Sequence, residues 1–262
     1  MKAELKSIAK DMVLSLPGAR ERYFQREFLK RSPSCKGAYE TFAEATAHAP
    51  KGKLFGYDHD SIPEFYKTRI DDFNQGDYPV IFWLSRLLPV TKFVFELGGS
   101  IGMGFYAYSR YLPFPPDLRW VICETAATVR TGRQVAQERH ETRLAFTDDR
   151  QPDGPPDIYA TFGTLQYIEE PFAEILSKLP AKPPHLLVGR VPFTEGKAYV
   201  TLQNNGGWFS PYGVRNRAAF LYTIESLGYE LVDKWETQHP NSFLLHPEYQ
   251  SPHYHGMYFR LK

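Results

Sequence analysis

A run of glycines with an acidic residue on either side is the feature of this sequence best suited to bind a ligand. Residues 93–97 (FVFEL) are typical of a buried strand, and residues 98–102 (GGSIG) follow them directly. Residues without a Cβ atom permit a tight turn and let a ligand approach the backbone, and the helix expected after them begins with unpaired N–H groups. We therefore predict that a nucleotide-like ligand binds at this turn. The turn residues predicted to hold it are Gly98, Gly99, Ser100 and Gly102.

The acidic residues indicate which ligand this turn prefers. Glu96 stands just before the glycines, where its charge would repel a pyrophosphate and attract the sulfonium and ammonium groups of S-adenosylmethionine. Glu124 ends the next predicted strand, and its carboxylate can accept hydrogen bonds from both hydroxyls of an adenosine ribose. Thr125 opens the following helix, so Glu124 also fits the role of an acid at a helix N-terminus. We predict S-adenosylmethionine as the cofactor, bound by Glu96, Glu124 and Thr125 together with the turn.

The same glycines leave a dinucleotide open as the alternative. Residues 102–107 (GMGFYA) fit the pattern G-x-G-x-x-A, and Glu124 lies 22 residues after Gly102. An NAD(P)-dependent oxidoreductase is therefore the first alternative function, and a non-catalytic cofactor-binding scaffold is the second. The absence of a Gly-Lys-Ser/Thr sequence excludes a P-loop for nucleoside triphosphates.

The segment 161–167 (TFGTLQY) comes at the end of the predicted strand 158–161, which places it at the same edge of the sheet as the glycine turn. Methyl transfer is an in-line displacement, so the protein mainly has to align the acceptor and exclude water. Gln166 and Tyr167 are the first candidates on the acceptor side, and His239 is a candidate general base for a hydroxyl acceptor. Tyr167 equally fits an ordinary packing role beside the next helix.

Four residues further along the chain are candidates for binding the acceptor. Arg190 comes at the end of the predicted strand 185–189, where it would clamp an acidic or phosphorylated acceptor or pair with a carboxylate of the fold. Gln203, Trp208 and Tyr212 lie in a polar and aromatic stretch without helical or strand periodicity, which fits an insertion over a substrate cleft or a solvent-exposed loop. Aromatic faces and amides together suit sugars. We predict methylation of an oxygen atom of a saccharide or another small acceptor.

The histidines near the C-terminus do not predict a metal site. His246, Glu248, His253 and His255 contain the ligand types that a metal would need. No helix or strand periodicity puts them on one face, and histidine is common in proline-rich loops. We expect no metal.

The elements that would position these residues alternate between strand and helix after residue 89, which predicts an α/β fold with a mostly parallel, Rossmann-like sheet. Strands are expected at residues 93–97, 120–123, 158–161 and 185–189, and helices at 103–111, 126–138 and 171–179. The C-terminal part adds a helix at 217–227 and strands at 229–235 and 257–261. A long connection joins the two closing strands, so we expect an antiparallel C-terminal edge strand.

Short helical segments precede this part of the chain. They predict an α-helical N-terminal cap over residues 1–88, ending with an apolar helix at 80–88, and a cofactor-binding methyltransferase domain over residues 89–262. The first 35 residues read as an amphipathic helix that is broken at Pro17-Gly18. Their basic excess fits a solvated helix face or a weak contact with an anionic membrane surface.

Composition excludes several classes of protein. Lys and Arg number 31 against 30 Asp and Glu, which disfavours a nucleic-acid binder. The longest apolar stretch, 78–90, carries Arg86 and is shorter than the ~20 residues of a transmembrane helix. The absence of a continuous apolar leader and the presence of only two cysteines lead us to expect a cytoplasmic protein. Nothing in the sequence indicates an oligomeric state.

Residues 96–102 (ELGGSIG) resemble motif I of the class I S-adenosylmethionine-dependent methyltransferases, with Ser100 where the usual pattern has glycine. Over residues 36–262 the chain is similar to a family of methyltransferases associated with bacterial surface-polysaccharide loci. The segments that carry this similarity are 36–45, 55–58, 120–124, 164–168 and 189–193.

This resemblance implies roles for several residues and a place in polysaccharide biosynthesis. The glycine turn would hold the cofactor and Glu124 its ribose. The segment 146–149 would bind the adenine, with Asp148 preferred over Asp149. The loop that begins at Thr161 and contains Gly163 would face the methyl group.

Overall fold

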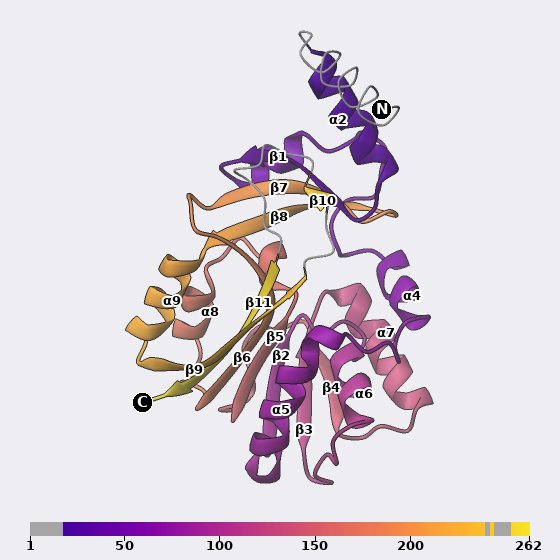
Figure 1. Cartoon of the computed structure of the whole chain (residues 1–262). Coiled ribbons are helices and arrows are strands. Elements are labelled where there is room, and N and C mark those ends of the chain that lie inside the picture. The colour runs from indigo at the N-terminus through magenta and orange to yellow at the C-terminus, as the bar shows by residue number, and fades with distance from the viewer. Residues whose placement is uncertain (1–17, 239–241, 244–252) are drawn as a thin grey trace, which may run out of the picture. The chain divides into compact units, whose positions relative to one another are not determined.

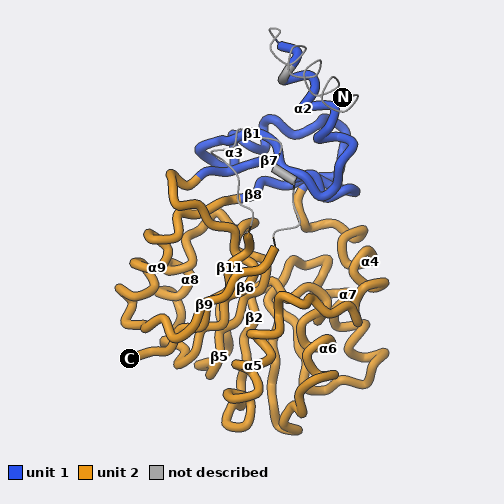
Figure 2. Tube along the Cα trace, viewed as in Figure 1, with its two compact units in different colours: residues 1–55, 199–212, 240–250 blue, residues 56–198, 213–239, 251–262 orange. Residues whose placement is uncertain are grey.

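The computed structural model describes residues 18–238, 242–243 and 253–262. The chain forms two compact units, each described here by itself (Figure 2). In the described part, unit 1 comprises residues 18–55, 199–212 and 242–243, and unit 2 comprises residues 56–198, 213–238 and 253–262.

Unit 2 is built on a sheet with the strand order β4-β3-β2-β5-β6-β11-β9. Its strands are β2 (Phe93–Leu97), β3 (Arg119–Cys123), β4 (Leu144–Thr147), β5 (Ile158–Phe162), β6 (His185–Thr194), β9 (Tyr229–Gln238) and β11 (His253–Leu261). The pairs from β4 through β6 are parallel, and β11 is antiparallel to both β6 and β9. The predicted mostly parallel α/β sheet is confirmed.

The antiparallel C-terminal strand lies one position in from the edge, because β9 is the outermost strand. The burial of the two strands explains this order. Residues 256–259 of β11 are all buried, whereas side chains along β9 alternate between partly buried and exposed. A strand buried along its centre gains from neighbours on both sides, and an edge strand tolerates polar, exposed side chains.

Helices cover both faces of this sheet (Figure 1). They are α4 (Ser61–Lys67), α5 (Tyr78–Leu87), α6 (Met103–Ser109), α7 (Ala126–Glu138), α8 (Phe172–Ser177) and α9 (Arg217–Ser226), with short 3-10 turns η1 (Gln75–Asp77), η2 (Leu88–Val90) and η3 (Leu165–Tyr167). Strand β2 shows how the core is divided: Val94 packs with α5 and α6, and Phe93 and Phe95 pack with α8 and α9. Alternate side chains of a strand point to opposite faces, so the two apolar layers form on either side of the sheet.

Unit 1 contains strands as well as helices, which corrects the prediction of an α-helical cap. It holds α2 (Ala19–Lys30), β1 (Ser34–Tyr39), α3 (Phe42–Ala47), β7 (Tyr199–Asn204), the first half of β8 (Phe209–Asn216) and β10 (Ser242–Phe243). Strand β1 is antiparallel to β7, more than 150 residues later in the chain, so its pairing is not visible in the local pattern. Phe28, Leu202 and Phe209 form the core of the unit.

The first boundary between the two units lies after residue 55, and not after residue 88, where the predicted cap ended. Residues 56–88 belong to unit 2, because α5 buries Val80 and Leu84 in the same cluster as Val94 of β2. The first half of the amphipathic helix predicted at 1–35 lies outside the described residues, and the described part is helical only from Ala19 to Lys30. None of the helices described is long and apolar enough to cross a membrane.

Candidate cofactor and acceptor site

The glycine turn joins β2 to α6 and has a conformation that needs glycine. Gly98 and Gly102 have φ angles of 79° and 100°, in the left-handed region. A Cβ atom on Gly98 would lie 2.1 Å from Oγ1 of Thr164, whose hydroxyl donates a hydrogen bond of 3.0 Å to the Gly98 carbonyl. Ser100 adopts the same region with φ 54° despite its side chain. The turn is therefore a tight backbone cradle fastened to the loop after β5.

Glu124 is held against this turn by backbone donors. Its Oε1 accepts from the N–H of Ser100 at 3.1 Å and its Oε2 from the N–H of Thr125 at 2.9 Å. Burial raises the pKa of Glu124, and the two N–H groups oppose that rise. Beside it, Oγ of Ser100 is buried without a hydrogen-bond partner among the residues the structure describes. This combination leaves hydrogen-bonding capacity for a ligand at the end of β3.

Glu96 lies underneath the turn. It is 2% exposed, and its Oε2 accepts a hydrogen bond of 2.8 Å from Nε1 of Trp120. A Cβ on Gly99 would come within 2.7 Å of the Glu96 carboxyl group, so only glycine lets the turn approach this carboxylate. Burial raises the pKa of Glu96 to about 7. A cation bound at the turn would favour the ionised form and lower that pKa.

The loop after β5 contributes polar atoms that no described residue satisfies. Thr161 and Gln166 are 1% and 2% exposed. Nε2 of Gln166 donates to the Gly163 carbonyl at 2.9 Å. Oγ1 of Thr161 and Oε1 of Gln166 are buried and have no partner within the described structure. Since buried polar atoms are normally paired, these two atoms mark a place where a ligand or water belongs.

Tyr167 follows in η3 and contacts Tyr57, with ring centroids 4.6 Å apart. Burial raises the pKa of Tyr167 well above its usual value, and the nearby Tyr57 and Tyr254 add to the rise. The phenol therefore stays protonated at neutral pH and serves as a hydrogen-bond donor rather than as a base.

Arg190 pairs with a carboxylate of the fold. Its Nη1 forms an ion pair with Oδ2 of Asp77, and its Nη2 donates to the Phe162 carbonyl at 3.0 Å. The same Oδ2 accepts from the hydroxyl of Tyr108 at 2.8 Å. Of the two roles considered for Arg190, pairing with a carboxylate of the fold is the one observed. Asp77 was not among the predicted site residues, although an acid just before an apolar helix is a visible signal in the sequence.

Residues before α5 also reach this region and were missed. Burial raises the pKa of Tyr66 of α4, and the charges of Glu124 and Arg190 act on it, so the three groups lie near one another. Asp58 accepts from the N–H of Ala127 at 3.4 Å, at the start of α7. The segment 57–66 is therefore fastened beside the end of β3.

Of the remaining predicted residues, one lies in unit 2, three belong to unit 1 and one lies outside the described residues. Asp148 is exposed just after β4. Gln203, Trp208 and Tyr212 belong to unit 1 and are 3%, 5% and 0% exposed. The expectation of an irregular stretch is wrong for Gln203 and Tyr212, which lie in β7 and β8. Strand β7 is buried at every position, so it shows no alternation of apolar and polar residues. His239 lies outside the described residues.

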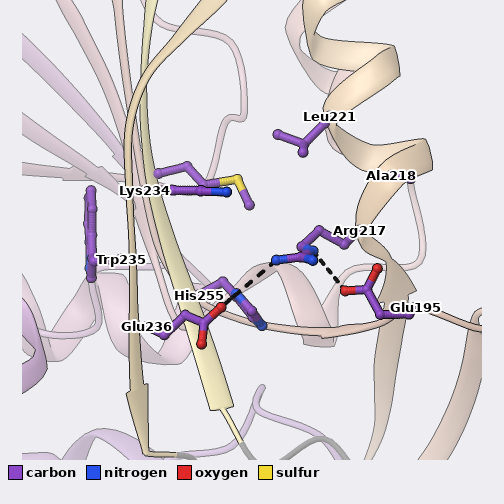
Figure 3. Close-up of a pocket in the computed structure, with 9 residues that line it drawn as sticks. Glu195, Arg217, Ala218, Leu221, Lys234, Trp235, Glu236 and His255 are labelled. Atoms are coloured by element: carbon purple, nitrogen blue, oxygen red, sulfur yellow. Dashed lines mark ion pairs between the residues drawn. The ribbon is translucent and has the colours of Figure 1, made fainter.

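A cavity of about 400 Å³ lies elsewhere in unit 2, beside α9, β9 and β11 (Figure 3). We call it the lateral cavity. Arg217 pairs with both glutamates that line it: its Nε lies 2.8 Å from Glu195, and its Nη1 lies 3.8 Å from Glu236. His255 lies 3.3 Å from Glu236. No residue of the predicted site lines this cavity. Across the described chain, no group of three or more metal-ligating side chains could hold a metal ion.

Neither a protein-family model nor a curated protein matches the sequence. Solved structures do match the fold. Magnesium protoporphyrin IX methyltransferase from Synechocystis with bound S-adenosylhomocysteine is 13% identical, with a TM-score of 0.50, over 78% of this chain and 95% of that one. The 1,6-didemethyltoxoflavin-N1-methyltransferase from Burkholderia thailandensis, with its substrate and S-adenosylhomocysteine bound, is 14% identical, with a TM-score of 0.50, over 88% and 94%. The chain thus has the Rossmann-like fold of the class I S-adenosylmethionine-dependent methyltransferases.

Proposed function

We propose that this protein is an S-adenosylmethionine-dependent methyltransferase that methylates an oxygen atom of a saccharide or another small acceptor. The observation that carries the proposal is Glu124, fixed by the N–H groups of Ser100 and Thr125 at the end of β3, beside a turn whose glycines have no room for a Cβ atom. The fold is the one found in methyltransferases crystallised with S-adenosylhomocysteine.

The residues present suit this cofactor. Each Glu124 oxygen accepts one N–H and keeps a lone pair that fits a ribose hydroxyl. The unpartnered Oγ of Ser100 adds a hydrogen-bonding group on the same side, and Asp148 remains our candidate for the adenine. Glu96 under the turn favours a positively charged ligand. When bound, the cofactor supplies an electrophilic methyl group on a sulfonium.

The dinucleotide alternative gains no support from the geometry of the turn. Its pattern should begin directly after the strand, but Gly102, its first glycine, comes five residues after the end of β2 at Leu97. The carboxyl group of Glu96 beneath Gly99 would oppose a pyrophosphate. The glycines at the turn itself are Gly98, Gly99 and Gly102.

On the acceptor side we assign positioning roles to Gln166 and Tyr167. The amide oxygen of Gln166, which has no partner among the described residues, can accept a hydrogen bond from an acceptor hydroxyl, and the phenol of Tyr167, which shares a hydrogen bond with Tyr57, stays protonated beside it. Thr161 and Gly163 line the cofactor side of the same loop. A hydroxyl acceptor suits this pair of groups. Because Tyr167 keeps its proton, His239 stays our candidate for the base.

Calorimetry with S-adenosylhomocysteine and, separately, with NADH tests the cofactor. We expect binding of S-adenosylhomocysteine only. Gly98→Ala should weaken it at least tenfold, because the new Cβ meets Thr164 in a left-handed turn. Gly154→Ala is the matched control, since nothing lies within 4 Å of a Cβ there. Binding of NADH alone would overturn the proposal.

A second experiment tests the acceptor. The protein is incubated with methyl-labelled S-adenosylmethionine and a panel of nucleotide sugars and cell-surface glycans. We expect label on a hydroxyl group of one panel member. Cofactor binding without any transfer, on this panel and on other small hydroxyl compounds, would favour a non-catalytic scaffold.

A further inference from the structure

The ion pair between Asp77 and Arg190 leaves one acceptor and one donor unused. Both partners of the Asp77 carboxylate, Arg190 and Tyr108, bond to Oδ2, so Oδ1 has no hydrogen-bond partner among the described residues. Arg190 uses Nη1 and Nη2, and within the same residues nothing accepts from its Nε. A pair that served only the fold would be expected to use these polar atoms internally.

The local backbone exposes this unused donor. Arg190 has φ 55°, unusual for a residue with a side chain. The register between β6 and β11 shifts here, so that Gly189 and Arg190 together lie opposite Gly256. Such a β-bulge redirects a side chain, and bulges of this kind are frequent beside active sites. Gly163 lacks the Cβ that would lie 3.1 Å from Nε of Arg190, which keeps that edge of the guanidinium uncovered.

The pair lies along the same edge as the rest of the site. Strands β3, β2, β5 and β6 are neighbours in that order, and all are parallel. Glu124 follows β3, the glycine turn follows β2, and Nη2 of Arg190 reaches the carbonyl of Phe162 at the end of β5. An extended ligand with its ribose at Glu124 and its sulfur near the turn would have its far end over β5, at the Asp77–Arg190 pair.

We propose that Asp77 and Arg190 bind the amino-acid end of the methyl donor, with Oδ1 of Asp77 accepting from its ammonium group and Nε of Arg190 donating to its carboxylate. This inference rests on the proposed function. The methionine part of the donor carries both charges, and the pair presents one free group of each kind. The charge of Arg190 is already balanced by Asp77, which disfavours a role for Arg190 as a clamp for an anionic acceptor.

Analogues of S-adenosylhomocysteine that lack parts of its amino-acid end test the proposal on the unmodified protein. Calorimetry compares S-adenosylhomocysteine, its decarboxylated analogue, and 5′-methylthioadenosine, which lacks the whole amino-acid end. We expect each truncation to weaken binding at least tenfold, the usual range for hydrogen bonds to charged groups. Equal affinities for all three would overturn the inference while leaving the cofactor assignment intact. Failure to bind any of them would instead overturn the proposed function.

Arg190→Lys tests the same contact from the protein side. Lysine preserves a cation for Asp77 but has no Nε–H group, so we expect a loss of at least tenfold in affinity for S-adenosylhomocysteine and a change of less than threefold for 5′-methylthioadenosine. Arg217→Lys, in the lateral cavity, is the matched control and should change neither affinity. If Arg190→Lys weakens both ligands equally, or neither, the contact with the amino-acid end is refuted.

Discussion

The site at the strand ends and the lateral cavity both contain acids and arginines, but they satisfy their charges differently. In the lateral cavity the side chains of Glu195 and Glu236 are 71% and 50% exposed, and both lie near Arg217. At the strand ends Glu96 and Asp77 are buried, and polar atoms such as Oγ of Ser100 have no partner in the described structure. Buried polar atoms with unused hydrogen-bonding capacity therefore indicate a ligand site better than the open lateral cavity does.

The largest contrast is expected from removing one acid in each region. Asp77→Ala leaves the guanidinium of Arg190 and the hydroxyl of Tyr108 without their carboxylate, and should lower the free energy of unfolding by about 3–5 kcal/mol. Glu195→Ala removes an exposed partner of Arg217 and should cost less than ~1 kcal/mol. Urea unfolding measures both. Equal losses would mean that the two regions do not differ in the way described.

A pH effect of slightly smaller size is expected from Glu96. Its folded pKa of about 7 exceeds the ordinary value of 4.5, so the stability that it contributes is fully present below 4.5 and is lost as the pH rises through 7. The loss amounts to about 3 kcal/mol, at 1.36 kcal/mol per pKa unit.

Denaturant titrations between pH 4 and 8 measure this slope. Glu96→Gln should remove most of this slope, the remainder coming from Glu124, whose pKa burial also raises, and Glu195→Gln should leave the slope in place. An undiminished slope in Glu96→Gln would show that another group carries it.

Ser100→Gly should have an effect of about 1 kcal/mol. Glycine relieves the left-handed strain at φ 54° and removes a buried hydroxyl without a partner, so the unfolding free energy should rise. The same change should weaken S-adenosylhomocysteine, because the hydroxyl is no longer available to it. Thermal unfolding and calorimetry report the two effects. Tighter binding by the variant would argue against a ligand contact at Oγ.

The smallest effect is expected in the lateral cavity. Burial lowers the pKa of His255 below 6.5, and Glu236 partly opposes that shift. The stability that neutral His255 contributes is therefore present above pH 6.5 and is lost as the pH falls through the pKa of His255 in the folded state. His255→Gln should reduce the loss of stability below pH 6.5. This change should be smaller than the one that Glu96→Gln produces between pH 4.5 and 7. Glu236→Gln should instead make the loss steeper, because it removes the charge that favours protonation.

Local patterns predicted four of the five strands of the parallel core, and missed β4. The apolar run before Gly98 predicted β2, and the predicted helix 126–138 coincides with α7. Predictions failed where partners come from distant segments. Strand β1 depends on β7, and β7 is buried throughout, so neither shows a strand periodicity. At the site, the role of Asp77 depends on its ion pair with Arg190, which lies 113 residues later in the chain.

Sequence alone determined the strand, turn and helix around Gly98, because the need for residues without Cβ and the alternation of apolar segments are local properties of the chain. Tertiary structure decided which carboxylates are buried, which are paired and which polar atoms remain unused. Burial and pairing depend on groups that approach through space, such as Trp120 on Glu96 and Tyr108 on Asp77. Burial raises the pKa of Glu96 although the hydrogen bond from Trp120 opposes that rise, and the pairing of Asp77 with Arg190 leaves each with one unused polar atom among the described residues.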